Sequence, residues 1–332
     1  MVTGANRTRR LALWLGLSTA ACVSTSPSAG ESGDSSSGDG SSDSSATSTE
    51  ASGGDGDGTD AGDGDGDGEA QPCNGYVELC DRPYDQVAFP GTHNANASTA
   101  YGYTLFNANH NSTLTEQLED GVRIMMLDVT YDGGQTMLCH GPCNLGSMPH
   151  LEGLAELYDF LVAHPREVFT IIYQDSISVE DMEADWVTSG MIDMVFAHAP
   201  GSAWPTLGEM IDAGTRVVVT AEAGGPPPAW FHHVWDEAWD TGYSWTSIDE
   251  MTCDLNRGST ENDLYLINHW VSTTLGTPSE AEAANSNSFE VLSARLQQCW
   301  SEAGQMPNFV AVDFYEDGDL FEAVAALNGL AP

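Results

Sequence analysis

The segment Phe89-Pro90-Gly91-Thr92-His93-Asn94 determines how the rest of this chain is interpreted. A short apolar run ends there in a histidine and a turn-forming asparagine. A second histidine, His140, follows the short apolar run 137–139 some fifty residues later. Two histidines at the ends of strands are what general acid–base chemistry needs if both rings must reach one substrate. Either histidine alone would carry little information, because hydrogen-bonded loop histidines are common.

Short apolar runs alternate with helical patterns on both sides of this segment. The candidate strands, nearly continuous in apolar residues as buried parallel strands should be, are residues 86–89, 123–130, 168–174, 216–221, 264–268 and 309–314. The candidate helices are residues 114–120, 151–163, 180–197, 206–213 and 288–303. This alternation predicts an α/β fold, a closed or nearly closed barrel. An open doubly wound sheet is the alternative, but no GxGxxG motif follows the first strand.

A barrel of this kind carries its catalytic groups just beyond the C-terminal ends of its strands. The polar residues at such positions are His93, Asn94, Asp128, His140, Gln174, Asp175, Glu222 and Asp313. A single strand-end aspartate is often a helix cap or a turn residue. Two histidines and several acids at the same kind of position favour catalysis.

The charge of the chain excludes one class of partner. Asp and Glu number 50 against 9 basic residues, all of them arginine, which gives a formal net charge of -41. Such a surface repels nucleic acids, and it repels anionic membranes unless a cation intervenes. A hydrophobic content of 41% is sufficient for a sizeable core.

The N-terminus predicts export. Residues 1–21 combine three arginines with an apolar run, 11–17, that is too short to span a bilayer. The sequence TAAC at 19–22 resembles a lipoprotein processing site, so lipid on Cys22 would hold the protein at a membrane surface. Ordinary cleavage and free secretion is the alternative. We therefore predict an exported protein, either a cell-envelope lipoprotein or an extracellular one.

Residues 22–72 are mostly Ser, Gly, Asp, Thr and Ala without apolar periodicity, which predicts a disordered linker before a folded domain at 73–332. Six cysteines remain in that domain, an even number that suits an oxidising compartment. Sequence alone leaves fifteen connectivities open. Pairing of nearest neighbours is our prediction, as 73–80, 139–143 and 253–299.

Five motifs resemble, in order, those of the phosphatidylinositol-specific phospholipase C X-domain superfamily, above all its small secreted or anchored branch. They are FPGTHNA (89–95), TEQLEDGVRIMMLD (115–128), LCH (138–140), FLVAHPREVFTII (160–172) and PNFVAVDFY (307–315). The resemblance covers nearly the whole folded part. It implies a distorted (β/α)8 TIM barrel and a phosphodiesterase that acts on lipid phosphodiesters, and we expect a monomer.

The resemblance also assigns catalytic roles. His93 would be the general base that takes a proton from a substrate hydroxyl, and His140 the general acid that protonates the departing alcohol. Asp313 would orient His93. Arg123, in the Gly-Val-Arg motif, would contact phosphate or act as a structural ion-pair partner.

Asn94 and Asp128 make the site resemble the calcium-dependent members, since the metal-independent ones carry arginine in place of Asp128. Oxygen ligands suit calcium, a hard cation. Met126 departs from this pattern, because the calcium-dependent type usually has glutamate there. Asp175 or Gln174 would then supply a further ligand.

The substrate class is left open between phosphatidylinositol and other phosphodiesters. One alternative is a non-catalytic member of the same fold that binds a headgroup or a sugar. Another is a barrel phosphodiesterase for glycerophosphodiesters or sphingomyelin, although the early His-Arg or Glu-Asn motif typical of that class is absent from this sequence. The aromatic residues between 230 and 245 either pack in the core or line the rim of the pocket.

Overall fold

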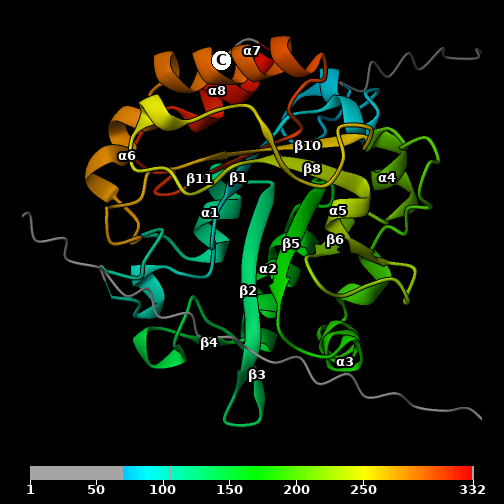
Figure 1. The fold of residues 1–332 in the computed structure, drawn as a ribbon. Coiled ribbons are helices and arrows are strands. Elements are labelled where there is room, and N and C mark those ends of the chain that lie inside the picture. The colour runs from blue at the N-terminus through cyan, green and yellow to red at the C-terminus, as the bar shows by residue number, and fades with distance from the viewer. Residues whose placement is uncertain (1–69, 105, 331–332) are drawn as a thin grey trace, which may run out of the picture. The chain divides into compact units, whose positions relative to one another are not determined.

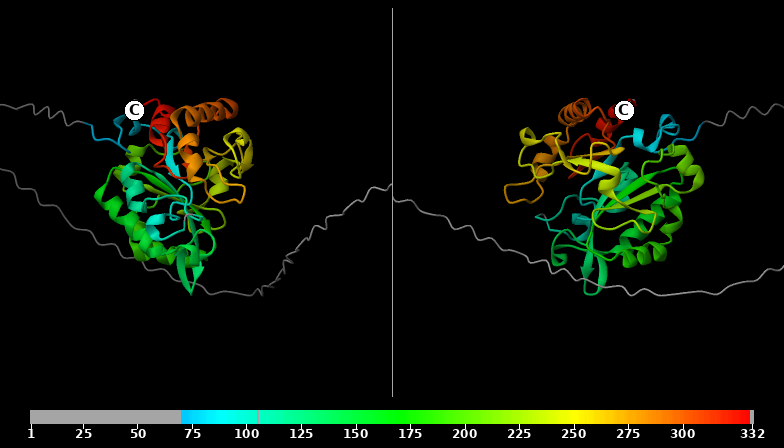
Figure 2. Two further views of the ribbon diagram at one scale, coloured as in Figure 1. Left: turned by 90° about the vertical axis from the view of Figure 1, so that its left-hand side faces the viewer. Right: turned by 45° about the vertical axis from the view of Figure 1, so that its right-hand side comes forward.

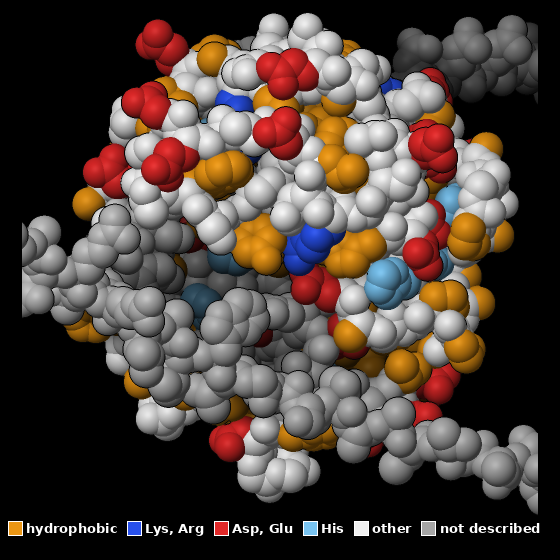
Figure 3. Space-filling view, viewed as in Figure 1, with side chains coloured by type: hydrophobic (Ala, Val, Ile, Leu, Met, Phe, Trp, Pro, Cys, Tyr) orange, Lys and Arg blue, Asp and Glu red, His pale blue; other side chains and the backbone are white. Residues whose placement is uncertain are grey.

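The computed structural model describes residues 70–104 and 106–330. The predicted signal segment, Cys22 and all but the last residues of the predicted linker lie outside the described residues. Acidic side chains are scattered over the face shown in Figure 3, and basic ones are few. Among the described residues, no helix combines the length and the apolar character that crossing a bilayer requires.

Eight parallel strands form one continuous curled sheet (Figure 1) in the order β7, β6, β5, β2, β1, β11, β10, β8. In that order their bounds are Phe231–His233, Val217–Ala221, Phe169–Asp175, Ile124–Asp132, Phe89–Thr92, Phe309–Val312, Leu264–His269 and Ala238–Thr241. In the described part of the chain, β7 and β8 share no ladder, so the ring of strands is open there. The predicted distorted (β/α)8 barrel is confirmed.

Three antiparallel strands extend this sheet. β9 (Leu255–Arg257) pairs with β8. β3 (Gln135–Leu138) pairs with the end of β2 and with β4 (Met148–Pro149), and this hairpin projects from the body in Figure 1. The hairpin fills the connection between β2 and the next helix, which is where His140 lies.

The helices lie outside the curled sheet (Figure 2). Helices α1 to α8 are Leu114–Asp120, His150–Ala163, Val179–Ser189, Leu207–Ala213, Val234–Glu237, Glu280–Ser286, Phe289–Ala303 and Leu320–Leu327. α3 is shorter than the predicted 180–197, because Gly190 takes a left-handed conformation with φ of 78° and ends it. α6, α8 and the short strands β7 and β8 were not predicted; the two strands have only three and four residues, too few to show a period.

The two faces of the sheet have separate cores, as the two-residue period of a strand requires. Along β2, Ile124 and Met126 face the barrel interior and pack with residues such as Phe309. Met125 and Leu127 face the other way and pack with the helices. Asp128, two residues beyond Met126 and on the same face of β2, therefore projects into the open end of the barrel.

β1 begins three residues later than the predicted 86–89. The predicted strand ends before Pro90, because a proline has no N–H to donate to a central ladder. Pro90 nevertheless offers its carbonyl, which accepts a hydrogen bond of 2.8 Å from the Arg123 N–H. His93 therefore follows the last residue of the strand directly.

Gly91 lets β1 lie between its two neighbours. A Cβ at this position would be 3.1 Å from Cβ of Ile124 and 3.2 Å from the carbonyl oxygen of Val310. Both contacts are tighter than a Cβ usually makes, so a side chain here would require the neighbouring strands to shift by a few tenths of an ångström.

The three predicted disulfides are confirmed, as Cys73–Cys80, Cys139–Cys143 and Cys253–Cys299. The second closes a small loop across His140. The third ties the segment between β8 and β9 to α7.

Candidate active site

His93 and Asp313 are brought together by the register of two neighbouring strands. Thr92 of β1 lies opposite Val312 of β11, so the residues that follow them are adjacent. Nδ1 of His93 donates a hydrogen bond of 2.9 Å to Oδ1 of Asp313. The imidazole side chain is 20% exposed and the carboxylate 5%. This bond fixes the tautomer and leaves Nε2 of His93 as the proton acceptor.

Both residues are followed by a backbone turn in the left-handed region. Asn94 has φ of 49° and Phe314 has φ of 47°, conformations that L residues other than glycine rarely adopt. The carbonyl of His93 accepts a 2.8 Å hydrogen bond from Nε2 of buried His110. The carbonyl of Asp313 accepts one of 2.9 Å from Nδ2 of buried Asn287. Strained turns held by buried side chains are typical of functional sites.

Trp270 covers one face of the His93 ring. It lies just beyond the end of β10 and is buried. The two ring planes are 3.8 Å apart between centroids and inclined by only 4°. This contact restricts the imidazole to one plane.

His140 lies in the loop between β3 and β4. Its Nδ1 donates to the carbonyl of Asn107 at 3.1 Å, and Nδ2 of Asn107 donates back to the carbonyl of His140. Burial lowers the pKa of His140, although the Asn107 bond opposes this. The charge of His93 lowers that pKa further, and the charge of Asp313 raises it.

A cavity at this end of the barrel contains four of the eight residues predicted to act in catalysis or metal binding, and His140 and Asp313 are not among its lining residues. It is lined by His93, Asn94, Met126, Leu127, Asp128, Ile172, Gln174, Glu222, Tyr243, Arg257 and Trp270. Asp128 and Gln174 are register partners on β2 and β5, on the interior face. Burial raises the pKa of Asp128 to about 7, with His93 lowering it and Glu222 raising it further.

Asp175 lies on the opposite face from Gln174, because successive residues of a strand alternate. Its Oδ1 accepts a 2.8 Å hydrogen bond from the Ala223 N–H. The structure does not bring it into the cavity. It holds the turn after β6 in place.

Arg123 lies at the other end of β2 from Asp128. Its Nε donates to Glu167 at 2.7 Å, and its Nη1 donates to the carbonyls of Leu118 and Val122. These contacts cap the end of α1. Of the two predicted roles, the structural ion pair is the one that its position supports, and it does not contact the cavity.

Arg257 of β9, like Trp270, is a residue of this site that the sequence did not reveal. Its guanidinium bonds Oε1 of Glu222 at 2.7 Å and Oδ2 of buried Asp240 at 2.6 Å. It also lies over the rings of Trp235, at 4.1 Å, and Tyr243, at 4.8 Å. Arg257 belongs to no sequence motif. The sequence feature that could have drawn attention to it is the scarcity of arginine in so acidic a chain.

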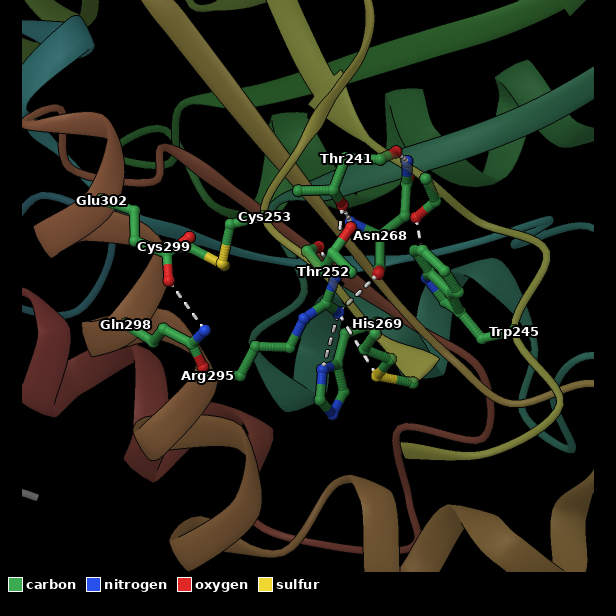
Figure 4. Close-up of a disulfide and its surroundings, with 12 residues drawn as sticks. Thr241, Trp245, Thr252, Cys253, Asn268, His269, Arg295, Gln298, Cys299 and Glu302 are labelled. Atoms are coloured by element: carbon green, nitrogen blue, oxygen red, sulfur yellow. Dashed lines mark hydrogen bonds between the residues drawn. A yellow bond between two sulfur atoms is a disulfide. The ribbon is translucent and has the colours of Figure 1, made fainter. Parts of the chain in front are cut away.

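Two contacts from α7 hold the segment before Arg257 in place. Figure 4 shows the disulfide between Cys253 and Cys299 and, beside it, the buried Arg295 of α7. Arg295 donates to the carbonyls of Thr252, at 3.1 Å, and Asn268, at 2.7 Å. A covalent and a hydrogen-bonded tie therefore fix the segment that leads to Arg257.

The donor set beside His93 suits a hard cation in its chemistry. Asn94, Asp128 and Gln174 offer one carboxylate and two amide oxygens, while Met126 offers only a thioether, a soft ligand. In the described residues, no three His, Cys, Asp or Glu side chains are grouped to hold a metal ion. A cation here would depend on the amide oxygens.

The described strands thus form an α/β barrel with a carboxylate-bonded histidine and an acidic cavity at their C-terminal ends. The family model described as PI-PLC X 1 matches residues 79–328. The chain belongs to the PI-PLC X domain family.

Curated relatives agree with this membership. A PI-PLC X domain-containing protein 1 from Arthroderma benhamiae is 29% identical over 278 residues, which cover 78% of this chain and 90% of that protein. An uncharacterized secreted protein of the same fungus is 28% identical over 78% of this chain and 64% of its own length. A PI-PLC X domain-containing protein from Arabidopsis thaliana is 28% identical over 74% of this chain and 63% of its own length.

Solved structures show the same fold. A phosphatidylinositol-specific phospholipase C from Staphylococcus aureus superposes with a TM-score of 0.54 at 12% sequence identity. The match covers 77% of this chain and 96% of that one. At this identity the likeness concerns the fold alone.

Proposed function

We propose that this protein is an exported phosphodiesterase that cleaves a lipid phosphodiester of the phosphatidylinositol type. The observation that carries the proposal is the His93–Asp313 pair, which leaves Nε2 of His93 free beside a cavity with acidic and cationic side chains. The family's solved enzymes and the secreted fungal relative support the substrate class and the export.

In the proposed reaction, Nε2 of His93 takes the proton of a substrate hydroxyl next to the phosphorus. The freed oxygen forms a bond to phosphorus while the bond to the lipid alcohol breaks. His140, in its doubly protonated imidazolium form, gives its Nε2 proton to the departing oxygen while its Nδ1–H stays bonded to the Asn107 carbonyl. Each such proton transfer typically contributes about 10²–10⁴-fold.

The negative charge that develops on phosphate needs a cationic partner. We include calcium in the proposal, held by Asn94, Asp128 and Gln174, where it would stabilise that charge. Arg257 and Glu222 face the same cavity and offer a donor and an acceptor to a hydroxylated, uncharged headgroup.

Hydrolysis of phosphatidylinositol vesicles, measured with calcium and with a chelator, tests the proposal. We expect turnover that requires calcium and falls by at least about 10²-fold in His93→Ala and in His140→Ala. Glu119→Gln, an exposed change on α1, is the matched control. A folded protein without turnover on any phosphodiester, or histidine variants as active as the parent, would refute it.

A further inference from the structure

We propose that residues 107–109, Asn-Ala-Asn, are a single positioning element that holds both catalytic histidines. Asn107 would align the general acid His140, and Asn109 would align Asp313 and, through it, the general base His93. The inference rests on the proposed function, since it assigns roles relative to that reaction. Both asparagines lie in the connection between β1 and α1, two residues apart.

Asn107 holds His140 from two sides. Its carbonyl accepts the Nδ1 proton of the ring at 3.1 Å, and its side-chain amide donates to the His140 backbone carbonyl. The first bond holds the Nδ1–H group of the ring and the second fixes the peptide that carries the ring. As the general acid, His140 must be in its doubly protonated imidazolium form, and with Nδ1–H engaged only its Nε2 proton is free to pass to the leaving oxygen.

Asn109 serves the base in the same way. It is 1% exposed, and its Nδ2 donates to Oδ1 of Asp313 at 2.8 Å, the same oxygen that accepts from His93. Its backbone carbonyl accepts the Phe314 N–H at 2.7 Å, which supports the left-handed turn directly after Asp313. The carboxylate is therefore fixed through both its side chain and its backbone.

The element is itself held firmly. The backbone N–H groups of Asn107 and Ala108 both donate to the carbonyl of Thr104, at 2.8 and 2.9 Å. Ala108 is buried against Ala97 and Tyr103. A displacement of this segment would therefore disturb the acid and the base together.

Two substrates separate these roles. A phosphodiester that releases an alcohol needs the general acid, because an alkoxide is a poor leaving group. A 4-nitrophenyl ester of the same inositol phosphate releases a weakly basic phenolate and does not need the acid. Both substrates need the base. A residue that acts through His140 should therefore matter only for the first substrate.

The experiment measures kcat on both substrates for Asn107→Ala and Asn109→Ala, with His140→Ala as the reference for loss of the acid. We expect Asn107→Ala to lose about tenfold on phosphatidylinositol and less than twofold on the nitrophenyl ester, the size of effect that removal of one orienting hydrogen bond gives. Asn109→Ala should lose about tenfold or more on both.

Asn111→Ala is the matched control. This asparagine lies in the same connection but is exposed and bonds Thr99 and Glu280, away from the cavity. It should leave kcat unchanged on both substrates. Asn107→Ser and Asn109→Ser provide smaller changes in case an alanine variant fails to fold, and thermal melting verifies folding for all.

Equal losses on both substrates for the Asn107 variants would mean a merely structural role and would overturn the inference. Activity at the parent level in folded Asn107 and Asn109 variants would overturn it too. If His93→Ala also keeps full activity, the proposed function fails. If His93→Ala is inactive while the asparagine variants behave as the parent does, only the inference fails.

Discussion

Replacement of Asp313 by asparagine separates the charge of this residue from its geometry. Both groups that contact Oδ1 are donors, namely Nδ1 of His93 at 2.9 Å and Nδ2 of Asn109 at 2.8 Å. An asparagine at 313 can therefore turn its carbonyl oxygen toward both. Its amide nitrogen would then occupy the place of Oδ2, a buried atom that has no partner in the described residues.

The magnitude follows from this arrangement. A charge-assisted hydrogen bond contributes about 1.5–3 kcal/mol, against about 1 kcal/mol for a neutral one, so Asp313→Asn should lose about 1–2 kcal/mol. That corresponds to roughly 5–30-fold in kcat. Asp313→Ala removes the acceptor altogether and should cost about 10⁴-fold in kcat, as loss of the orienting acid does in catalytic triads.

The assay is kcat on phosphatidylinositol for both variants, with thermal melting to verify that each is folded. We expect Asp313→Asn to melt close to the parent, because one unpaired buried atom replaces another. Equal losses in the two variants would refute the reasoning, since the amide would then fail to take the predicted orientation. Parent-level activity of Asp313→Asn would show that the charge contributes nothing.

Three further predictions concern stability and metal binding. Gly91→Ala places a methyl group 3.1 Å from Ile124 Cβ and should lower the free energy of unfolding by about 1–3 kcal/mol in urea titration; an unchanged midpoint would contradict the close packing. Burial lowers the pKa of His198, but its bonds to Glu237 and to the Ser202 carbonyl outweigh burial, so the net pKa is raised. The His198–Glu237 pair therefore stabilises the fold fully below about pH 6.5, and this stabilisation is lost as the pH rises through the raised pKa. Glu237→Gln should therefore be more destabilising at pH 5.5 than at pH 8, and an equal effect at both would exclude this linkage. Calcium should raise the melting temperature of the parent but not of Asp128→Asn. A calcium concentration of about a hundred times Kd adds about 2.7 kcal/mol to the free energy of unfolding. A shift of equal size in both proteins would place the ion elsewhere.

The sequence predicts the central strands well from their nearly continuous apolar runs and the longer helices from their periodicity. α1 has the predicted bounds, 114–120; Thr113 forms a capping box before it, and Gly121 ends it in a left-handed conformation. β1 is displaced because its proline and glycine are usual signs of a strand end. Their actual roles depend on neighbouring strands that are distant in sequence, which no local pattern reveals.

The site likewise contains residues that the sequence predicts and residues that only the fold reveals. His93, Asn94, Asp128 and Asp313 follow or end strands, so topology alone brings them to one edge of the barrel. Of the alternative ligands Asp175 and Gln174, only Gln174 lines the cavity, because successive residues of a strand face opposite ways. Arg257 enters from an antiparallel strand beyond β8, and only the tertiary fold reveals it.

The open ring of strands also bears on what determines the width of the cavity mouth. In a closed barrel, strand number and stagger determine the circumference. In the described residues β7 and β8 share no ladder, and the two arms of the sheet are joined at the mouth by a side-chain ion pair between Arg257 of β9 and Glu222 beyond β6. Both side chains are about a quarter exposed, at 26% and 25%, where an ion pair weakens with salt. Higher ionic strength should therefore weaken this link between the two arms while leaving the strand pairings intact.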